Sequence, residues 1–237
     1  MKKKLLFVLI LGAFAQVSYA QEFGLSFSYF IPRNGDISTP ISPFSFRGVG
    51  VNLNKYLALE TGITLYRMSG LSMTGIPFES DKSLVGPNFT FFVPGEIVIQ
   101  FPARNFEFDI KGGGFVFYGL NQKLNYGNID RAIRTMEGWD VVNSDFSFKN
   151  SPGFGIHAGV ELTVNVTKQF GISLEVNYLM GGSALPLTGS YTGGTLGAAN
   201  QAKTAEYDDA KVDFTGVEVS IGVFMRSGGG GPQRKKR

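Results

Sequence analysis

The residues from 159 to 180, GVELTVNVTKQFGISLEVNYLM, alternate strictly between apolar side chains and polar or small ones on both sides of a short break. Leu162 and Leu174 lie on the apolar rows, and Glu161 and Glu175 lie on the polar rows. A period of two residues is typical of a β-strand with two unlike faces, so this stretch predicts an amphipathic hairpin. The medium that surrounds its apolar face decides which class of protein this is.

The same period recurs along the chain in segments rich in Val, Ile, Phe and Tyr. It predicts eight strands, at residues 22–32, 44–54, 57–68, 88–101, 105–118, 153–167, 170–181 and 211–226. The breaks between them alternate in length. Short ones at 55–56, 102–104 and 168–169 alternate with long ones at 33–43, 69–87, 119–152 and 182–210. Short turns at one end and long loops at the other are typical of outer-membrane barrels.

The polar rows contain glycines and isolated acids with few bases, which suits the crowded interior of a narrow barrel, whereas the apolar rows suit contact with lipid. The sequence therefore predicts a polar network in the lumen, formed by Glu60, Glu96, Glu107, Asp109, Lys111, His157, Glu161, Glu175 and Glu218. Arg226 and Arg47 are further candidates. Strict alternation from Val49 points Arg47 outward, and a bulge at Gly48 turns it inward.

Aromatic residues gather near the ends of the expected strands, as in the aromatic girdles of membrane barrels. The expected girdle residues include Tyr29, Phe30, Tyr66, Phe91, Phe101, Phe117, Tyr118 and Phe224. The fold class that follows is all-β: an eight-stranded antiparallel up-and-down transmembrane β-barrel, with ten strands possible if the long third loop adds two more. An even number of strands places both termini in the periplasm.

Both ends of the sequence carry signals outside the expected barrel. Residues 1–20 combine a basic start, an apolar run and a small-residue SYA site, which predicts a secretory signal peptide that is cut before Gln21. Residues 21–226 form the barrel, and residues 227–237, SGGGGPQRKKR, predict a flexible basic periplasmic tail.

The charge balance and the absence of cysteine exclude several classes of protein. Of the 22 lysines and arginines, three lie at residues 2–4 and four at the last four positions, so acids outnumber bases in the body of the chain. This excludes a basic nucleic-acid-binding domain. The chain has no cysteine, which excludes a disulfide scaffold, a thiol nucleophile and a Cys-ligated metal site.

The leader, the hairpin GVGVNLNKYLALETGITLY and the loop pattern resemble those of the small outer-membrane β-barrel proteins of Bacteroidota, the porin-like or outer membrane protein beta-barrel domain type. The resemblance covers about residues 21–226. It implies the fold and the location, but no site. One departure is that such chains often end on an aromatic residue of the last strand, whereas here GVFMR is followed by eleven more residues.

The sequence contains few residues that could form a catalytic or metal-binding site. The lone histidine, His157, lies on the inward row with Glu161, and two pleats separate the pair by about 13 Å. Some outer-membrane barrels modify lipid A with His, Ser and an acid, and Ser151 and Ser173 are candidates for such a set. A histidine that is simply hydrogen-bonded in the lumen is the alternative. The acidic EYDDAKVD segment at 206–213 lacks the glycine of a calcium loop. We expect no cofactor and no metal site.

The long third loop contains the most distinctive segment, NIDRAIRTMEGW. Helical spacing within it predicts a short helix that begins near Asn128 and stops at Gly138. The helix either packs over the barrel mouth or forms a candidate docking element of Ile129, Ile133, Met136 and Trp139 for a partner or for lipid.

The sequence favours a non-enzymatic outer-membrane protein with a structural or partner-binding role, alone or as a subunit of a larger envelope assembly. Its expected partners are outer-membrane lipids and proteins that bind the extracellular loops or the basic tail, and not nucleic acid. A lipid A deacylase or acyltransferase and a small-solute porin are the alternatives.

Overall fold

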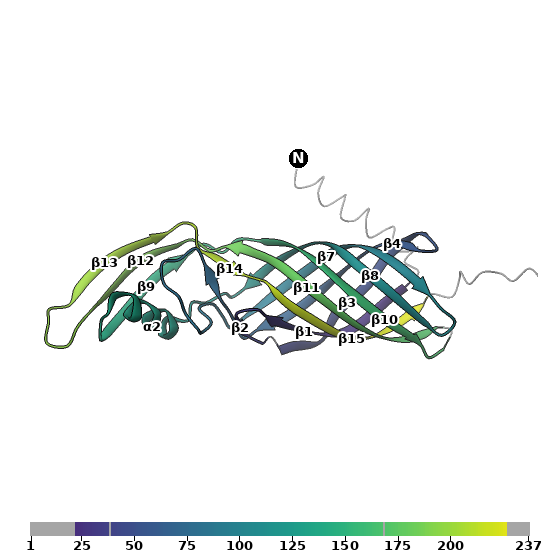
Figure 1. The fold of residues 1–237 in the computed structure, drawn as a ribbon, viewed down its shortest axis with the longest axis horizontal. Coiled ribbons are helices and arrows are strands. Elements are labelled where there is room, and N and C mark those ends of the chain that lie inside the picture. The colour runs from purple at the N-terminus through teal and green to yellow at the C-terminus, as the bar shows by residue number, and fades with distance from the viewer. Residues whose placement is uncertain (1–21, 38, 168, 227–237) are drawn as a thin grey trace, which may run out of the picture.

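The computed structural model describes residues 22–37, 39–167 and 169–226. The expected signal peptide at 1–20 and the expected tail at 227–237 lie outside these residues. Figure 1 shows two regions along the long axis: a barrel on the right and a smaller sheet with a helix on the left, which we call the extension.

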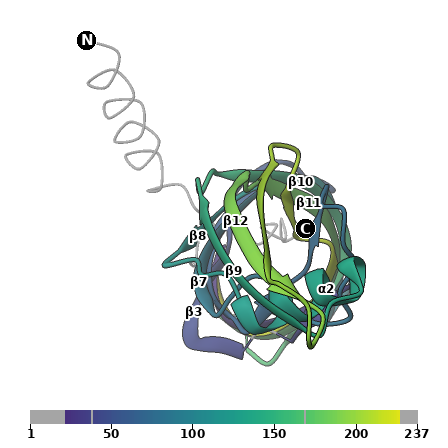
Figure 2. The same ribbon diagram turned by 90° about the vertical axis from the view of Figure 1, so that its left-hand side faces the viewer.

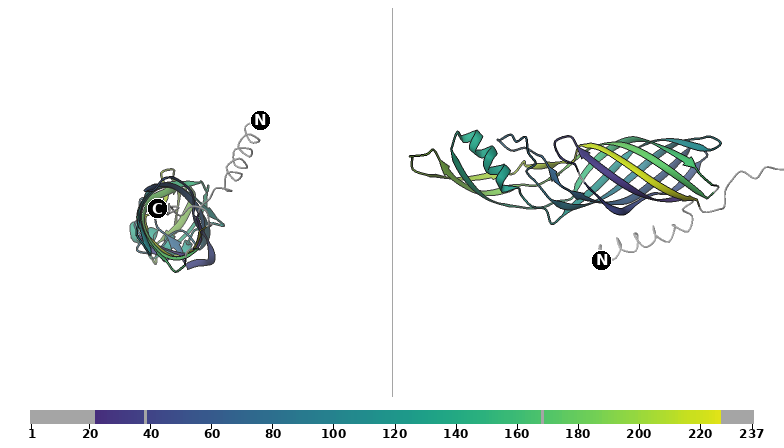
Figure 3. Two further views of the ribbon diagram at one scale, coloured as in Figure 1. Left: turned by 90° about the vertical axis from the view of Figure 1, so that its right-hand side faces the viewer. Right: turned by 90° about the horizontal axis from the view of Figure 1, so that it is seen from below.

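Eight long antiparallel strands form the barrel. They are β1 (Glu22–Pro32), β3 (Thr39–Asn54), β4 (Leu57–Met68), β7 (Asn88–Pro102), β8 (Phe106–Leu120), β10 (Gly153–Asn165), β11 (Phe170–Ala184) and β15 (Gly216–Arg226). The hydrogen-bonded order is β10-β8-β7-β4-β3-β1-β15-β11, and an additional β10–β11 pairing closes the ring. Figure 3 shows the closed ring along its axis. The predicted fold class is confirmed.

The two rows of the opening hairpin face opposite sides of the barrel wall. Leu162 and Leu174 pair across β10 and β11 and are 42% and 47% exposed. Their neighbours Glu161 and Glu175 pair as well and are each only 2% exposed. The apolar row therefore covers the outside of the barrel and the polar row fills the inside, which is the reverse of a water-soluble sandwich.

The extension is a three-stranded antiparallel sheet with order β13-β12-β9. Its strands are β9 (Val141–Phe148), β12 (Leu187–Gly194) and β13 (Gln201–Tyr207), and helix α2 (Tyr126–Glu137) packs beside β9. In Figure 2, seen from this end, β9, β12 and α2 stand in front of the ring of barrel strands. The extra strands of the long loops thus form a sheet of their own, so the ten-strand alternative for the barrel is wrong.

Short strands join the two regions. They are β2 (Gly35–Asp36), β5 (Gly70–Leu71), β6 (Met73–Thr74) and β14 (Lys211–Asp213). The predicted strand 211–226 is divided into β14 and β15, and Phe214 lies fully buried in the break between them.

Helix α2 begins at Tyr126, earlier than predicted from Asn128, and ends at Glu137, with Gly138 as the residue that stops it, as predicted. Gly138 adopts the left-handed conformation at φ 67°, which glycine reaches without a steric penalty. Ile129, Ala132 and Ile133 are buried against the sheet. Among the described residues, no helix is long and apolar enough to cross a membrane.

Candidate functional site

The structure places the predicted network residues on the inner side of the barrel. Seven of them are buried: Glu96, Asp109, Lys111, His157, Glu161, Glu175 and Glu218. Glu60 and Glu107 are half-buried. Gln100 donates a weak hydrogen bond to Glu107 at 3.4 Å. The side chain of Arg226 lies outside the described set.

Arg47 is the first centre of the network, and a β-bulge brings it inside. The register between β3 and β4 shifts between Phe46 and Val49, and Gly48 has a φ of +70° that favours glycine. The shift turns Arg47 into the lumen, where it is 4% exposed. Its guanidinium donates to Glu218, which also accepts a hydrogen bond from Tyr66.

Asn177 and two further carboxylates complete the surroundings of Glu218 and Arg47. Asn177 donates to Glu218 at 2.9 Å and to Glu175 at 2.7 Å. Arg47 lies 3.8 Å from Glu175 and 3.9 Å from Glu96. A buried carboxylate tolerates the loss of water only when charge and hydrogen bonds replace it, and Glu218 has both.

Lys111 is the second centre. Its ammonium lies 2.5 Å from Glu161, 3.3 Å from Glu60 and 3.9 Å from both Glu96 and Glu175. One lysine therefore joins carboxylates from β4, β7, β10 and β11, and together with Arg47 it ties opposite walls of the barrel to one another. This arrangement fills the middle of the lumen with paired charges and braces it against collapse.

His157 does not lie in a catalytic arrangement. It pairs in register with Leu179 of β11, and Ser173 lies six residues further along that strand, or about 20 Å away. Ser151 precedes β10 and forms no hydrogen bond with the Nε2 atom of His157, which has no hydrogen-bond partner among the described residues. The nearest ionisable contact is Glu96 at 3.7 Å. The sets that the sequence suggested with Ser151 or Ser173 are thus not assembled.

Above the charged centre, towards the extension, aromatic rings fill the barrel. Phe214 stacks on Phe30 with ring centroids 4.5 Å apart and on Phe117 at 4.2 Å. Phe92 lies 6.0 Å from Tyr66 and 5.0 Å from Phe115. We call these six residues the aromatic layer.

The aromatic layer corrects part of the predicted girdle. Phe30, Tyr66, Phe117 and Phe224 are buried and point into the lumen, whereas Tyr29, Phe91, Phe101 and Tyr118 are exposed on the outside. Whether an aromatic residue points inward or outward follows from its place in the alternation along its strand, not from its distance to the strand end. Phe30 shares the inward row of β1 with Ser26 and Ser28, which are also buried.

The candidate docking residues of the third loop are split between core and surface. Ile129 and Ile133 are fully buried in the core of the extension, so the prediction that they offer an apolar docking face is wrong. The reason is that the loop strands form a sheet for the helix to pack on. Met136 is 38% exposed, and Trp139 is partly buried against Tyr191 with ring centroids 6.0 Å apart.

A polar contact fixes the end of α2 to the sheet. Glu137 accepts a hydrogen bond from Tyr191 at 2.7 Å and pairs with Lys203 at 2.5 Å. The hydrogen bond from Lys203 lowers the pKa of Glu137. Burial, followed by the hydrogen bond to Glu137, raises the pKa of Tyr191, and burial raises the pKa of Tyr207. Lys203 also lies 5.1 Å above the ring of Trp139.

Among the described residues, no group of three or more His, Asp or Glu side chains is arranged to hold a metal ion. Tyr66 and Asn177 were not among the predicted network residues, and Arg47 was a candidate whose direction the sequence left open. Tyr66 and Asn177 share the inward parity of Thr64 and Glu175, which was a signal in the sequence, whereas the inward turn of Arg47 depends on the bulge.

Comparisons with known proteins find structural similarity only. No protein-family model matches the sequence. No curated protein matches it either. The outer membrane protein OprG of Pseudomonas aeruginosa is similar at 12% identity and a TM-score of 0.45, covering 88% of this chain and 97% of OprG.

Two other solved structures show similarity at the same level. A major outer membrane protein of Thermus thermophilus has 9% identity and a TM-score of 0.43, covering 87% of this chain and 98% of its own. Ail, the attachment invasion locus protein of Yersinia pestis, has 12% identity and a TM-score of 0.40, covering 87% of this chain and 95% of Ail. The closed ring of strand pairs, rather than these weak similarities, defines the fold.

Proposed function

We propose that this protein is an integral outer-membrane barrel that anchors a folded extension and binds a partner at the cell surface through it. The observation that supports this most is the combination of a filled lumen with an extension that has its own sheet and helix, and whose buried core is continuous with the aromatic layer. The barrel then serves as a rigid support rather than as a passage.

The outward rows support the membrane location. Leu25, Phe27, Ile172, Leu174 and Ile221 are all more than 40% exposed, and they belong to three neighbouring strands. Moving such an apolar surface from water into lipid is favourable by about 25 cal/mol per Å². A closed barrel also pairs the backbone groups that lipid cannot satisfy.

The loop lengths support the orientation. Three short turns lie at one end of the barrel, and the extension lies at the other. In outer-membrane barrels short turns face the periplasm and long loops face outward. The extension then projects from the cell, with both termini of the barrel on the periplasmic side.

The sheet of the extension offers a surface for a partner. One face packs on the helix side through Leu187 and Tyr191, which are buried. The alternate residues Thr188, Ser190 and Thr192 are exposed, and Asp145 and Thr204 flank Ser190 on the neighbouring strands. These side chains are short, so a partner could approach the backbone closely.

The alternatives fit the geometry less well. A small-solute porin needs a path through the barrel, and both the Arg47–Lys111 centre and the aromatic layer lie across it. A lipid-modifying enzyme needs a nucleophile beside His157, and Ser173 is about 20 Å away along β11. Single-channel conductance in planar bilayers and lipid A mass spectra of a His157→Ala strain test these two directly.

A photo-crosslinking residue in cells tests the proposed function. We place it at Thr192 on the open face of the sheet and, as a control, at Leu174 on the lipid-facing row. The proposal expects one discrete protein adduct from position 192 and only lipid adducts from position 174. It fails if both positions give the same products, or if position 192 gives none.

A further inference from the structure

The three-stranded sheet of the extension has two edges, and their backbone groups have different surroundings. β9 is one edge strand and β13 is the other, because β12 lies between them. An edge strand carries a row of backbone N–H and C=O groups that no neighbouring strand pairs. The hydrogen bonds of these two rows show which edge is closed and which is open.

Helix α2 closes the edge of β9. The backbone N–H group of Ser144 donates to the carboxylate of Asp130 at 2.9 Å, and the hydroxyl of Tyr126 donates to the backbone carbonyl of Phe146 at 2.7 Å. Asp130 and Tyr126 both belong to α2. Side chains of the helix therefore take the place of a fourth strand along this part of β9.

The same contacts show which backbone groups of β13 point away from the sheet. In an antiparallel pair, residues whose backbone groups face the neighbour alternate with residues whose groups face away. Ser144 turns its N–H group away from β12, so its partner Tyr191 turns its own groups towards Lys203 of β13. Lys203 therefore bonds to β12. The residues that alternate with it point their backbone groups away from β12, and we call them the outward row: Ala202, Thr204 and Glu206.

The outward row is left uncovered by the parts of the chain that the structure describes. Its three residues are exposed, and no backbone hydrogen bond from another described segment reaches them. β13 contains no proline, and its seven pairs with β12 run without a register shift. Proteins commonly protect an edge strand with a proline, a bulge or a covering element. Because β13 has none of these, its edge is free to pair with another strand.

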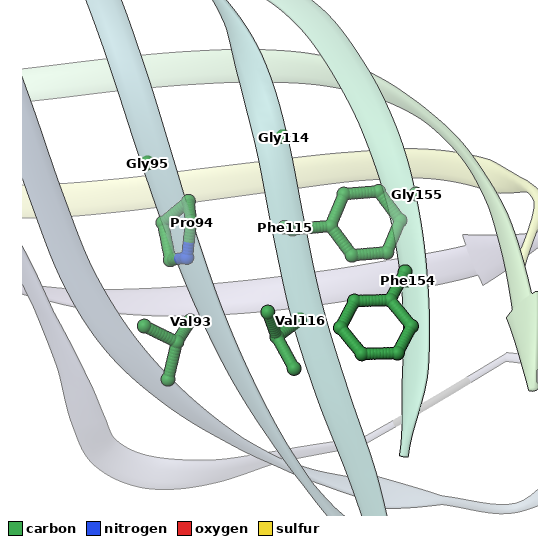
Figure 4. A pocket seen from close by; sticks show the side chains of 8 residues that line it. All are labelled: Val93, Pro94, Gly95, Gly114, Phe115, Val116, Phe154 and Gly155. Atoms are coloured by element: carbon green, nitrogen blue, oxygen red, sulfur yellow. The ribbon is translucent and has the colours of Figure 1, made fainter. Parts of the chain in front are cut away.

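The barrel offers no such edge, because each of its strands has a neighbour on both sides in the closed ring. Figure 4 shows the shallow hollow of its outer wall, with Val93, Val116 and Phe154 beside it. Here too the strands are paired, since Gly95 lies directly opposite Gly114 across β7 and β8. The barrel wall therefore presents side chains to its surroundings, whereas β13 presents backbone groups.

The backbone groups of this edge specify an extended segment as the occupant, because a strand presents N–H and C=O groups at the same spacing. The direction of β13 narrows the choice. β13 runs along the long axis of the molecule (Figure 1), and copies of this chain in one membrane share that direction. Pairing between two copies would be parallel, whereas antiparallel pairing, the more stable kind, needs a segment that runs the opposite way.

We propose that the edge of β13 binds an extended segment of a partner protein as an antiparallel fourth strand. This inference rests on the function proposed above and names the form in which the partner is recognised. The added strand pairs its backbone with the outward row. On the core side of the sheet it passes Ala205, whose short side chain leaves room between the half-buried Lys203 and Tyr207. An apolar residue there extends the core of the extension, because Ala205 and Tyr207 lie at its margin.

A proline in the outward row tests the proposal, because it removes one N–H donor and leaves the bonds to β12 intact. The readout is the protein adduct that the photo-crosslinking residue at position 192, opposite Ala202, forms in cells. We expect Thr204→Pro to lower the yield of this adduct about tenfold, whereas Thr204→Val keeps the N–H group and should retain the adduct.

Hydrogen exchange of β12 in the purified variants checks that the sheet stays intact. If Thr204→Pro loosens the sheet, Ala202→Pro and its matched variant Ala202→Val repeat the test near the start of β13.

Equal adduct yields from the wild type, Thr204→Pro and Thr204→Val would overturn this proposal and leave the function proposed above standing. Loss of the adduct in Thr204→Val as well would assign the contact to the side chain and overturn it too. So would an adduct in which the partner is a second copy of this chain. If the wild type itself gives no adduct at position 192, the function proposed above fails, and this inference fails with it.

Discussion

The barrel and the extension bury opposite kinds of residue. In the barrel, Leu174 is 47% exposed and Glu218 is fully buried, whereas in the extension Leu187 is fully buried and Glu206 is exposed. Both regions consist of antiparallel strands with the same period of two. The comparison shows that the period specifies a strand, while the surrounding medium decides which of its faces is inside.

The regions also differ in what holds them together. The barrel interior has two charged centres and an aromatic layer, so its polar groups depend on a few named partners. The extension relies on an apolar core that includes Ile129, Ile133 and Phe146. At its surface, the contacts of Glu137 with Tyr191 and Lys203, which we call the Glu137 clamp, fix the end of α2 to the sheet. Substitutions in the barrel lumen and in the core of the extension should therefore destabilise the two regions differently, and measuring their effects tests the comparison.

The largest effect is expected from Arg47→Ala. It leaves the buried Glu218 without its guanidinium, and the loss of one partner of a buried ion pair costs about 3–5 kcal/mol. Urea unfolding in lipid vesicles measures the cost. Arg67→Ala, on the exposed side of β4, is the control and should cost about 1 kcal/mol or less. Equal costs would show that the lumen charges do not brace the barrel.

A comparable loss is expected inside the extension from Leu187→Ala. The side chain is fully buried, and Leu→Ala in a core costs about 2–5 kcal/mol because a cavity remains. The loss should appear as faster hydrogen exchange in β9, β12 and β13, with the barrel strands unchanged. Leu174→Ala on the outside of the barrel leaves no cavity, so it should cost less. An equal loss of protection in both regions would show that they unfold as one unit.

The smallest effect concerns the acid dependence of the Glu137 clamp. Because the folded state lowers the pKa of Glu137 below its ordinary value of 4.5, the clamp stabilises the extension above that pH. The stabilisation is lost as the pH falls through the folded pKa. An exposed pair contributes about 0.2–1 kcal/mol. Hydrogen exchange of α2 between pH 6 and about 3 should show this loss in the wild type and not in Glu137→Gln.

Much of the barrel could be predicted from the sequence because lipid and lumen impose opposite demands on alternate residues. The observed bounds of β1 and β4 are those predicted. The strands β3, β8, β11 and β15 differ at their ends towards the extension, whereas β7, β8 and β10 differ by one or two residues at the short turns. The sequence could not decide whether Arg47 points into the lumen or outward, because a bulge reverses the alternation of side chains without changing the composition. The aromatic layer was missed because Phe30 and Tyr66 were assigned by their position near strand ends and not by parity.

The extension was predicted less completely. The helix and its stop at Gly138 were recognisable from apolar spacing, but the sheet under it was not. Strands such as β12, LTGSYTGG, carry small polar residues on one face and only two large apolar residues, Leu187 and Tyr191, between glycines on the other, which resembles a loop in composition. Their pairing with β9 and β13 joins segments from different loops, and single-segment patterns contain no information on such contacts.

The central claim is that lipid surrounds the outward row of Leu162 and Leu174. The chain has no cysteine, so single cysteines with spin labels can be introduced one by one at positions 171–178. In bilayers, the account predicts high oxygen accessibility and low accessibility to a water-soluble nickel reagent at 172, 174, 176 and 178. Labels at the odd-numbered positions should show low oxygen accessibility. Labels at 172 and 174 that are shielded from both reagents, in a protein that stays monodisperse in plain buffer, would contradict it.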